Sequence, residues 1–126
     1  MRLLIDTHIL IWADERPRAI APALRAALLD ETNEIFISAA SIWEIGVKRA
    51  IGKLRFARPI VAAVTALGFE VLPVTGAHAE EAGGLPRHHN DPFDRLIIAQ
   101  ALVEGMVLGT QDRAMRAYGA ITLGLD

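Results

Sequence analysis

The stretch RLLIDTH, residues 2–8, decides the fold class of this chain. Its apolar run, Leu3 to Ile5, stops abruptly at the carboxylate of Asp6. A short continuous apolar run is typical of a strand that is buried on both faces, as strands are in parallel sheets. A charge at the end of such a strand is costly unless it caps a helix, binds a cation or takes part in chemistry. The stretch therefore predicts a parallel sheet whose first strand ends in a capping or functional acid.

Four further strands alternate with helical patterns along the chain. The expected strands are EIFIS (34–38), FEVLPV (69–74), MVLGT (106–110) and AITLG (120–124). The expected helices cover residues 9–13, 21–29, 39–51, 59–68, 75–83, 92–105 and 111–119, and residues 83–90 are expected to form a loop. This alternation predicts an α/β fold: a small, parallel, Rossmann-like β-sheet flanked by helices on both faces. A length of 126 residues corresponds to one domain, expected over residues 1–126.

The composition excludes several classes of protein. With 52% hydrophobic and 22% charged residues the chain is not intrinsically disordered, and without cysteine it has neither disulfides nor thiolate metal sites. No apolar run reaches the roughly 20 residues that span a bilayer, and the N-terminus lacks the layout of a signal peptide. We therefore expect a cytoplasmic protein with no membrane segment. The net charge of −2 argues against a broad electrostatic nucleic-acid binder, but not against an enzyme that acts on nucleic acid with bound cations.

Acidic residues follow two of the expected strands and begin or line two of the expected helices. Asp112 comes two residues after the strand MVLGT, so it is expected at the same edge of the sheet as Asp6. Asp94 lies in the first turn of the helix that follows Asp91, and Glu44 lies about two turns into its own helix. Each acid also has a structural alternative, as a helix N-cap, as a partner of the helix dipole or as an exposed helix residue.

The acids favour a functional site when they are considered together. Four carboxylates in one pocket repel each other strongly, and a structural role does not explain why they would gather. Divalent cations do explain it, because Mg²⁺ and Mn²⁺ prefer oxygen ligands. Such metal sites activate water and stabilise the leaving oxygen when a phosphodiester is cleaved.

Four segments, in order along the chain, resemble the PIN domain, and specifically the VapC-type toxin ribonucleases of type II toxin–antitoxin systems. The segments are LLIDTHILIWA (3–13), ISAASIWEIGVKRAIGKL (37–54), HHNDPFDRLIIAQAL (88–102) and LGTQD (108–112). The resemblance implies a small parallel sheet between helices. It also implies an endoribonuclease that uses Mg²⁺ or Mn²⁺ and hydrolyses RNA phosphodiesters by in-line attack of water that the metal activates.

The resemblance also implies which residues act and which partners bind. The catalytic and metal-binding acids of the family fall on Asp6, Glu44, Asp94 and Asp112. Thr110 is implied as a supporting hydroxyl, Asp91 is a secondary candidate ligand, and Gly109 stands where a bulkier residue is more usual. The implied partners are an RNA substrate, a VapB-like antitoxin whose tail blocks the site, and a second copy in a homodimer. The alternative function is a catalytically silent PIN-fold module that binds RNA or protein, which the loss of acids would favour; all four acids are present.

A basic segment, residues 48–58, has two interpretations. Its side chains could form a solvated helix end, where the helix dipole favours cations. They could instead contact RNA phosphates beside the acids, with Phe56 as a surface for base stacking. The candidate RNA-contacting residues are Lys48, Arg49, Lys53 and Arg55.

Two other sets of residues near the acids also require interpretation. Arg95 and Arg113 each follow a candidate ligand directly, so they could steady carboxylates or contact RNA phosphates. His88 and His89 are expected in a polar loop rather than in a zinc site, because no cysteine or paired HxxxH element supplies the remaining ligands.

Overall fold

The computed structural model describes residues 1–125, and Asp126, the last residue of the expected domain, lies outside the described residues. Five strands form one parallel sheet in the order β3-β2-β1-β4-β5. The strands are β1 (Arg2–Ile5), β2 (Glu34–Ser38), β3 (Glu70–Leu72), β4 (Val107–Gly109) and β5 (Thr122–Leu123). The predicted parallel sheet is confirmed.

Helices follow the strands in alternation, as the α/β prediction requires. They are α1 (Thr7–Glu15), α2 (Pro22–Leu29), α3 (Ala39–Ala50), α4 (Ile60–Ala66), α5 (Gly76–Gly84) and α6 (Pro92–Glu104), with the 3-10 helices η1 (Pro17–Ala19) and η2 (Arg113–Tyr118). Within residues 1–125, none of these helices has both the length and the apolar character needed to cross a membrane.

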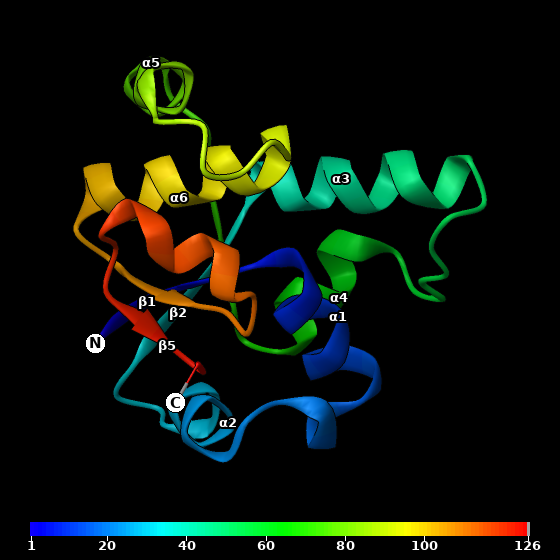
Figure 1. The fold of residues 1–126 in the computed structure, drawn as a ribbon. Coiled ribbons are helices and arrows are strands. Elements are labelled where there is room, and N and C mark those ends of the chain that lie inside the picture. The colour runs from blue at the N-terminus through cyan, green and yellow to red at the C-terminus, as the bar shows by residue number, and fades with distance from the viewer. Residues whose placement is uncertain (126) are drawn as a thin grey trace.

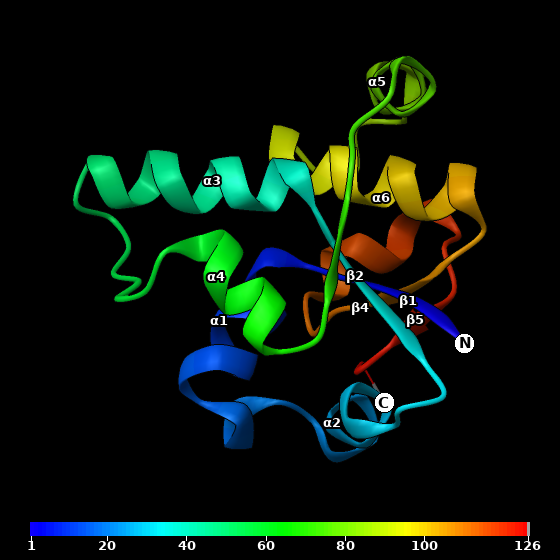
Figure 2. The same ribbon diagram turned by 180° about the vertical axis from the view of Figure 1, so that it is seen from behind.

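Both faces of the sheet are covered, as the apolar run in β1 predicts. Leu3 and Ile5 are fully buried in one core with residues of α1, α2 and α4, whereas Leu4 is fully buried in a second core with residues of α6 and η2. Figures 1 and 2 show α6 on one side of the sheet, α1, α2 and α4 on the other, and α5 beyond α6. Successive strand side chains point to opposite faces, so a strand between two layers must be apolar throughout.

Several elements differ in extent from the prediction. The first helix begins at Thr7 rather than Ile9, because Asp6 caps it by accepting a hydrogen bond from the amide of Ile9. The edge strands β3 and β5 pair over shorter stretches than expected, since each has a neighbour on one side only. The helix expected over 111–119 is the 3-10 helix η2, which Asp112 caps.

At Gly109, where the resemblance leads us to expect a bulkier residue, a side chain would fit only if its neighbours shifted. A Cβ atom there would lie 3.0 Å from Cγ2 of Ile5 and 3.1 Å from Cδ1 of Leu24. Leu24 comes from α2, so this helix packs directly onto the end of β4. The side chains of Ile5 and Leu24 thus fill the space that a bulkier residue at 109 would occupy.

The strand order places a crevice at the centre of the sheet. From β1 the chain continues to β2 on one side, and from β4 it continues to β5 on the other. In open parallel sheets, ligands bind outside the carboxyl ends of strands at such a switch point. Asp6 directly follows β1 and Thr110 directly follows β4, so both stand at this point.

Candidate active site

Asp6 is buried at the end of β1, with 4% of its surface exposed. Its Oδ1 accepts a hydrogen bond from the amide of Ile9 at 2.9 Å, and its Oδ2 accepts one from the hydroxyl of Thr110. Burial raises the pKa of Asp6, and the hydrogen bonds from Thr110 and Ile9 oppose that rise. Asp6 is therefore a helix cap whose second oxygen is held toward the end of β4.

Thr110 connects Asp6 to Asp112. Its fully buried hydroxyl donates to Asp6 and accepts a hydrogen bond from the amide of Asp112 at 3.0 Å. Asp112 caps η2 through the amide of Ala114, at 3.0 Å, and its side chain remains 47% exposed. A cavity of about 300 Å³ opens here; it is lined by Asp6, His8, Ile9, Trp12, Gln111 and Asp112. The two acids that follow β1 and β4 thus line one cavity, as their strand positions predict.

The start of α6 supplies two further acids. Asp91 caps the helix, because its Oδ1 accepts hydrogen bonds from the amides of Phe93 and Asp94. The pKa of Asp94 is raised to about 7, first by burial and then by the negative charges of Asp91 and Glu44, while His89 acts in the opposite direction. Because Asp91 and Glu44 come from different helices, the raised pKa of Asp94 indicates that the acids share one electrostatic environment.

Glu44 is buried in α3, with 3% of its surface exposed, and is not an exposed helix residue. Its Oε1 accepts a hydrogen bond from the hydroxyl of Thr7 at 2.6 Å, and its Oε2 pairs with the ammonium of Lys48 one turn further along. The hydrogen bond to Glu44 raises the pKa of Lys48, and the charges of Asp91 and Asp94 act in the same direction. Lys48 therefore neutralises part of the acid cluster.

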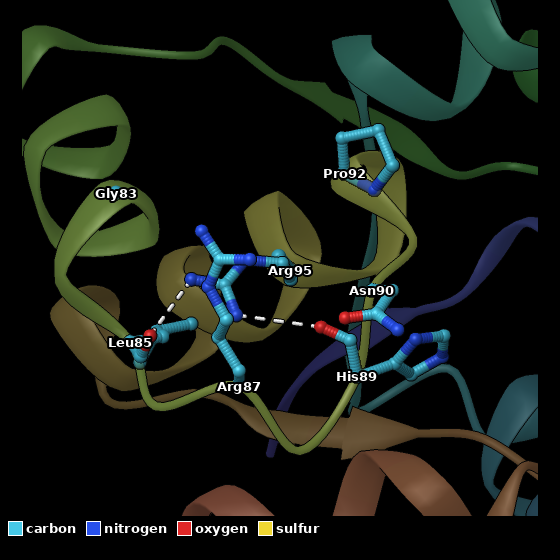
Figure 3. Close-up of a pocket in the computed structure, with 7 residues that line it drawn as sticks. All are labelled: Gly83, Leu85, Arg87, His89, Asn90, Pro92 and Arg95. Carbon is cyan, nitrogen blue, oxygen red and sulfur yellow. Dashed lines mark hydrogen bonds between the residues drawn. The ribbon is translucent and has the colours of Figure 1, made fainter.

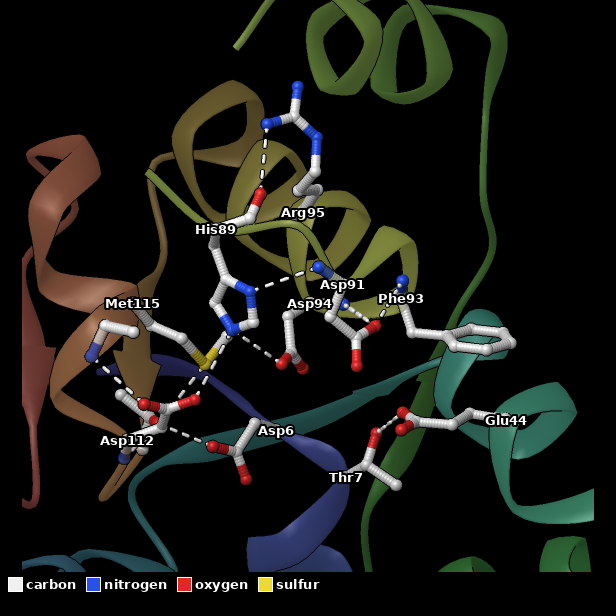
Figure 4. Close-up of polar contacts among 12 residues, drawn as sticks. Asp6, Thr7, Glu44, His89, Asp91, Phe93, Asp94, Arg95, Asp112 and Met115 are labelled. Atoms are coloured by element: carbon white, nitrogen blue, oxygen red, sulfur yellow. Dashed lines mark hydrogen bonds and ion pairs between the residues drawn. The ribbon is translucent and has the colours of Figure 1, made fainter. Parts of the chain in front are cut away.

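His89 joins these acids, although it was expected only as part of a polar loop. Its Nε2 lies 3.0 Å from Oδ2 of Asp94 and 3.5 Å from Oδ2 of Asp112 (Figure 4). These three side chains can offer ligand atoms that all lie within 4.8 Å of one another. The expected polar loop is present between α5 and α6, but His89 points from it into the site. The sequence contains one indication of this position: His89 lies two residues before the cap Asp91, and that spacing brings it near the first turn of α6.

The arrangement of the acids fits a hard divalent cation. In Figure 4, Asp6 lies between Asp112 on one side and Glu44 with Thr7 on the other, and Asp94 lies above it. Carboxylate oxygens predominate among the donors, which is the ligand chemistry that Mg²⁺ and Mn²⁺ favour. A cation would also relieve the repulsion that raises the pKa of Asp94.

Two of the four candidate RNA-contacting residues in the basic segment bind other groups of the protein. Lys48 pairs with Glu44, and the guanidinium of Arg49 donates to the backbone carbonyls of Phe56 and Arg58 at 3.3 and 3.5 Å. Lys53 and Arg55 have exposed side chains. Phe56 is only 4% exposed and belongs to the core, so the expectation that it offers a surface for base stacking is wrong.

Arg95 has a role that was not among the expected alternatives. Its guanidinium donates to backbone carbonyls in the last turn of α5 and in the segment between α5 and α6, and the acceptors are Ala82, Leu85, Pro86 and His89. Figure 3 shows this arginine and His89 in the lining of a cavity of about 280 Å³. Arg95 therefore holds the loop rather than a carboxylate, while Arg113 stays exposed.

Comparison with known proteins gives a family match over most of the chain. The model of the PIN domain matches residues 3–121. Ribonuclease VapC22 of Mycobacterium tuberculosis is 29% identical over 119 residues, which cover 92% of this chain and 91% of that protein.

Solved structures share the fold at low sequence identity. The structure of VapBC2 from Rickettsia felis bound to a DNA fragment from their promoter includes a chain with a TM-score of 0.73 and 18% identity, and the match covers 100% of both chains. A chain of DNA-bound VapBC from Salmonella typhimurium has a TM-score of 0.71 and 18% identity, over 98% of this chain and 97% of that one.

Proposed function

Because this chain belongs to the PIN domain family, we propose that it is a divalent-metal-dependent endoribonuclease, the toxin of a VapBC-type toxin–antitoxin pair. The observation that carries the proposal is that Asp6, Asp94 and Asp112 come together at the switch point of the sheet, from three separate parts of the chain. The similarity to Ribonuclease VapC22 supports RNA as the substrate. The single domain that performs this function extends over residues 1–126.

Asp6, Glu44, Asp94 and Asp112 would hold the metal, with Asp91 as a secondary candidate. When bound, Mg²⁺ or Mn²⁺ supplies activation of a water molecule and stabilisation of the negative charge on the leaving oxygen. The protein around them orients the carboxylates: Thr110 fixes Oδ2 of Asp6, and Thr7 fixes Oε1 of Glu44. Asp94, with a pKa raised to about 7, can hold a proton on its carboxylate near neutral pH until a cation replaces it.

The substrate and partners follow from the same proposal. Exposed Lys53 and Arg55 would contact RNA phosphates. Lys48 would do so from the edge of the acid cluster, and Arg49 from the end of α3, where it also holds the carbonyls of Phe56 and Arg58. A VapB-like antitoxin would block the acid site. An exposed apolar stripe is formed by Trp43 and Val47 of α3 and by Ile51 directly after it, with exposures of 67%, 36% and 62%. This stripe supports a homodimer through α3.

The test is RNA cleavage by the purified protein with Mg²⁺ or Mn²⁺, compared with cleavage in EDTA. We expect cleavage that stops in EDTA and is abolished by Asp6→Asn, because the amide is an uncharged and weaker ligand. Asp30→Asn is the control, since Asp30 lies in an exposed turn after α2 and should leave cleavage unchanged. Full activity in EDTA, or full activity of Asp6→Asn, would contradict the proposal.

A further inference from the structure

The carboxylates of the site differ in what orients them. Four of the five carboxylates accept a hydrogen bond from a helix: Asp6, Asp112 and Asp91 each from an amide of the helix that they cap, and Glu44 from a side chain of the neighbouring helix α1. These donors are the amide of Ile9 for Asp6, the amide of Ala114 for Asp112, the amide of Phe93 for Asp91 and the hydroxyl of Thr7 for Glu44. Within residues 1–125, the polar group that contacts the carboxylate of Asp94 is Nε2 of His89, at 3.0 Å. Asp94 thus depends on the loop before α6.

The imidazole of His89 is set to act as a donor toward two acids. The amide of Asp91 donates to its Nδ1 at 3.2 Å, so Nδ1 is an acceptor and the neutral ring carries its proton on Nε2. Nε2 is shielded from solvent and is aligned with no single acceptor among the described residues. It faces Oδ2 of Asp94 at 3.0 Å and Oδ2 of Asp112 at 3.5 Å, and so lies between both carboxylates.

The loop that carries His89 is anchored from two sides. The guanidinium of Arg95 donates to backbone carbonyls on both ends of the loop, including that of His89 at 3.3 Å. The phenol of Tyr118 in η2 accepts a hydrogen bond from the amide of His89 at 2.6 Å, and its ring packs against His88 at 5.2 Å. These contacts fix the backbone, so the place of the imidazole is preorganised.

We propose that His89 is a positioning residue of the metal site, which holds Asp94 and Asp112 at the separation that a divalent cation requires. The inference rests on the proposed metal-dependent function. Two carboxylates this close repel each other, and an N–H dipole between them reduces the repulsion before a cation arrives. Donors that orient ligating carboxylates raise metal affinity, and their loss typically costs about 10–100-fold.

The experiment is a calorimetric titration of the metal-free protein with Mn²⁺. We expect His89→Ala to weaken Mn²⁺ binding by about 10–100-fold. His89→Gln keeps an N–H donor and should recover part of the affinity. Glu81→Gln, at an exposed position of α5 away from the acids, is the control and should leave affinity unchanged. In an Asp94→Asn background, His89→Ala should cost much less than in the wild type, because its effect acts through Asp94. A merely structural role would lower the melting temperature without this dependence on Asp94.

Several outcomes decide against the inference. Mn²⁺ binding that is unchanged or tighter in folded His89→Ala would overturn the inference. Tighter binding would indicate that the imidazole competes with the metal for the carboxylates. If His89→Ala does not fold, His89→Leu replaces it, and equal affinities of His89→Leu and His89→Gln would overturn the inference. If the wild-type protein nevertheless binds Mn²⁺ and cleaves RNA, the inference about His89 fails but the proposed function stands. Wild-type protein that binds no Mn²⁺ overturns the proposed function and the inference with it.

Discussion

At the scale of single residues, Asp6 shows how one carboxylate serves both the fold and the site. Its Oδ1 caps α1 through the amide of Ile9, and its Oδ2 meets the hydroxyl of Thr110 across the switch point. Capping requires one oxygen only. The second oxygen explains why the acid follows a fully buried strand, where burial raises its pKa and makes the ionised form costly without a cation.

The raised pKa of Asp94 predicts how the metal-free protein responds to pH. The pKa of Asp94 is about 7 in the folded protein, above the ordinary 3.8, so the folded protein holds this proton more tightly than the unfolded chain does. The stability linked to this proton is fully present at a pH where Asp94 is protonated in both the folded and the unfolded protein. The contribution of Asp94 to the free energy of unfolding should therefore be largest below about pH 4, and it should fall as the pH rises toward about 7. Thermal unfolding in EDTA across this range measures the slope.

Asp94→Asn should reduce that slope, because the amide does not ionise. Part of the slope should persist, since burial also raises the pKa of Asp6. Glu31→Gln, at an exposed position in the turn before β2, is the control and should keep the wild-type slope. The same slope in Asp94→Asn as in the wild type would show that Asp94 ionises freely in the folded protein.

At the scale of elements, local signals predicted some features well and others poorly. Helix α6 was predicted closely because Asp91 caps its start and Gly105, with φ of 65°, ends it. The edge strands were predicted too long, because the pairing that limits them depends on their neighbours in the sheet. The roles of Arg95 and His89 were not predicted, since both depend on how the loop closes against α6 and η2. Contacts between elements leave no local pattern in the sequence.

The basic segment after α3 carries a prediction that the structure sharpens. Lys53 and Arg55 are exposed, whereas Lys48 and Arg49 are engaged within the protein. Changing Lys53 and Arg55 together to alanine should therefore weaken RNA binding and flatten its salt dependence. Each phosphate contact with single-stranded nucleic acid contributes about 0.7 to the slope of log K against log salt. Binding measured at several salt concentrations, with a catalytically inactive background, gives that slope.

The matched control for this pair is Arg16 with Arg18, which lie in an exposed turn around η1. Changing them to alanine removes the same charge from another surface. An equal loss of salt dependence in both double variants would mean that net charge, rather than contact by the segment, controls binding. The solvated-helix-end interpretation would then hold.

At the scale of the whole molecule, the site exists only because the sheet closes in one order. Asp6 and Asp112 are far apart in the chain, and the parallel pairing of β1 with β4 brings their strand ends together. Glu44 and Asp94 arrive on α3 and α6, which pack against each other. The topological rule for parallel sheets predicted this edge from the sequence, whereas it could not give the distances between the side chains. A cation bound here would connect separate elements of the fold.

That connection predicts how metal and stability are linked. If Mg²⁺ binds the folded protein alone, a hundredfold excess over its dissociation constant raises the free energy of unfolding by ~2.7 kcal/mol. Asp6→Asn should gain much less, because the buried charge that attracts the ion is gone. Without metal the variant should be at least as stable as the wild type, since the asparagine oxygen can still accept the hydrogen bond from Ile9 while the cost of a buried charge is removed. Melting curves of both proteins, with Mg²⁺ and with EDTA, measure all four states. A variant that unfolds in EDTA would identify Asp6 as a structural cap whose charge the fold itself requires.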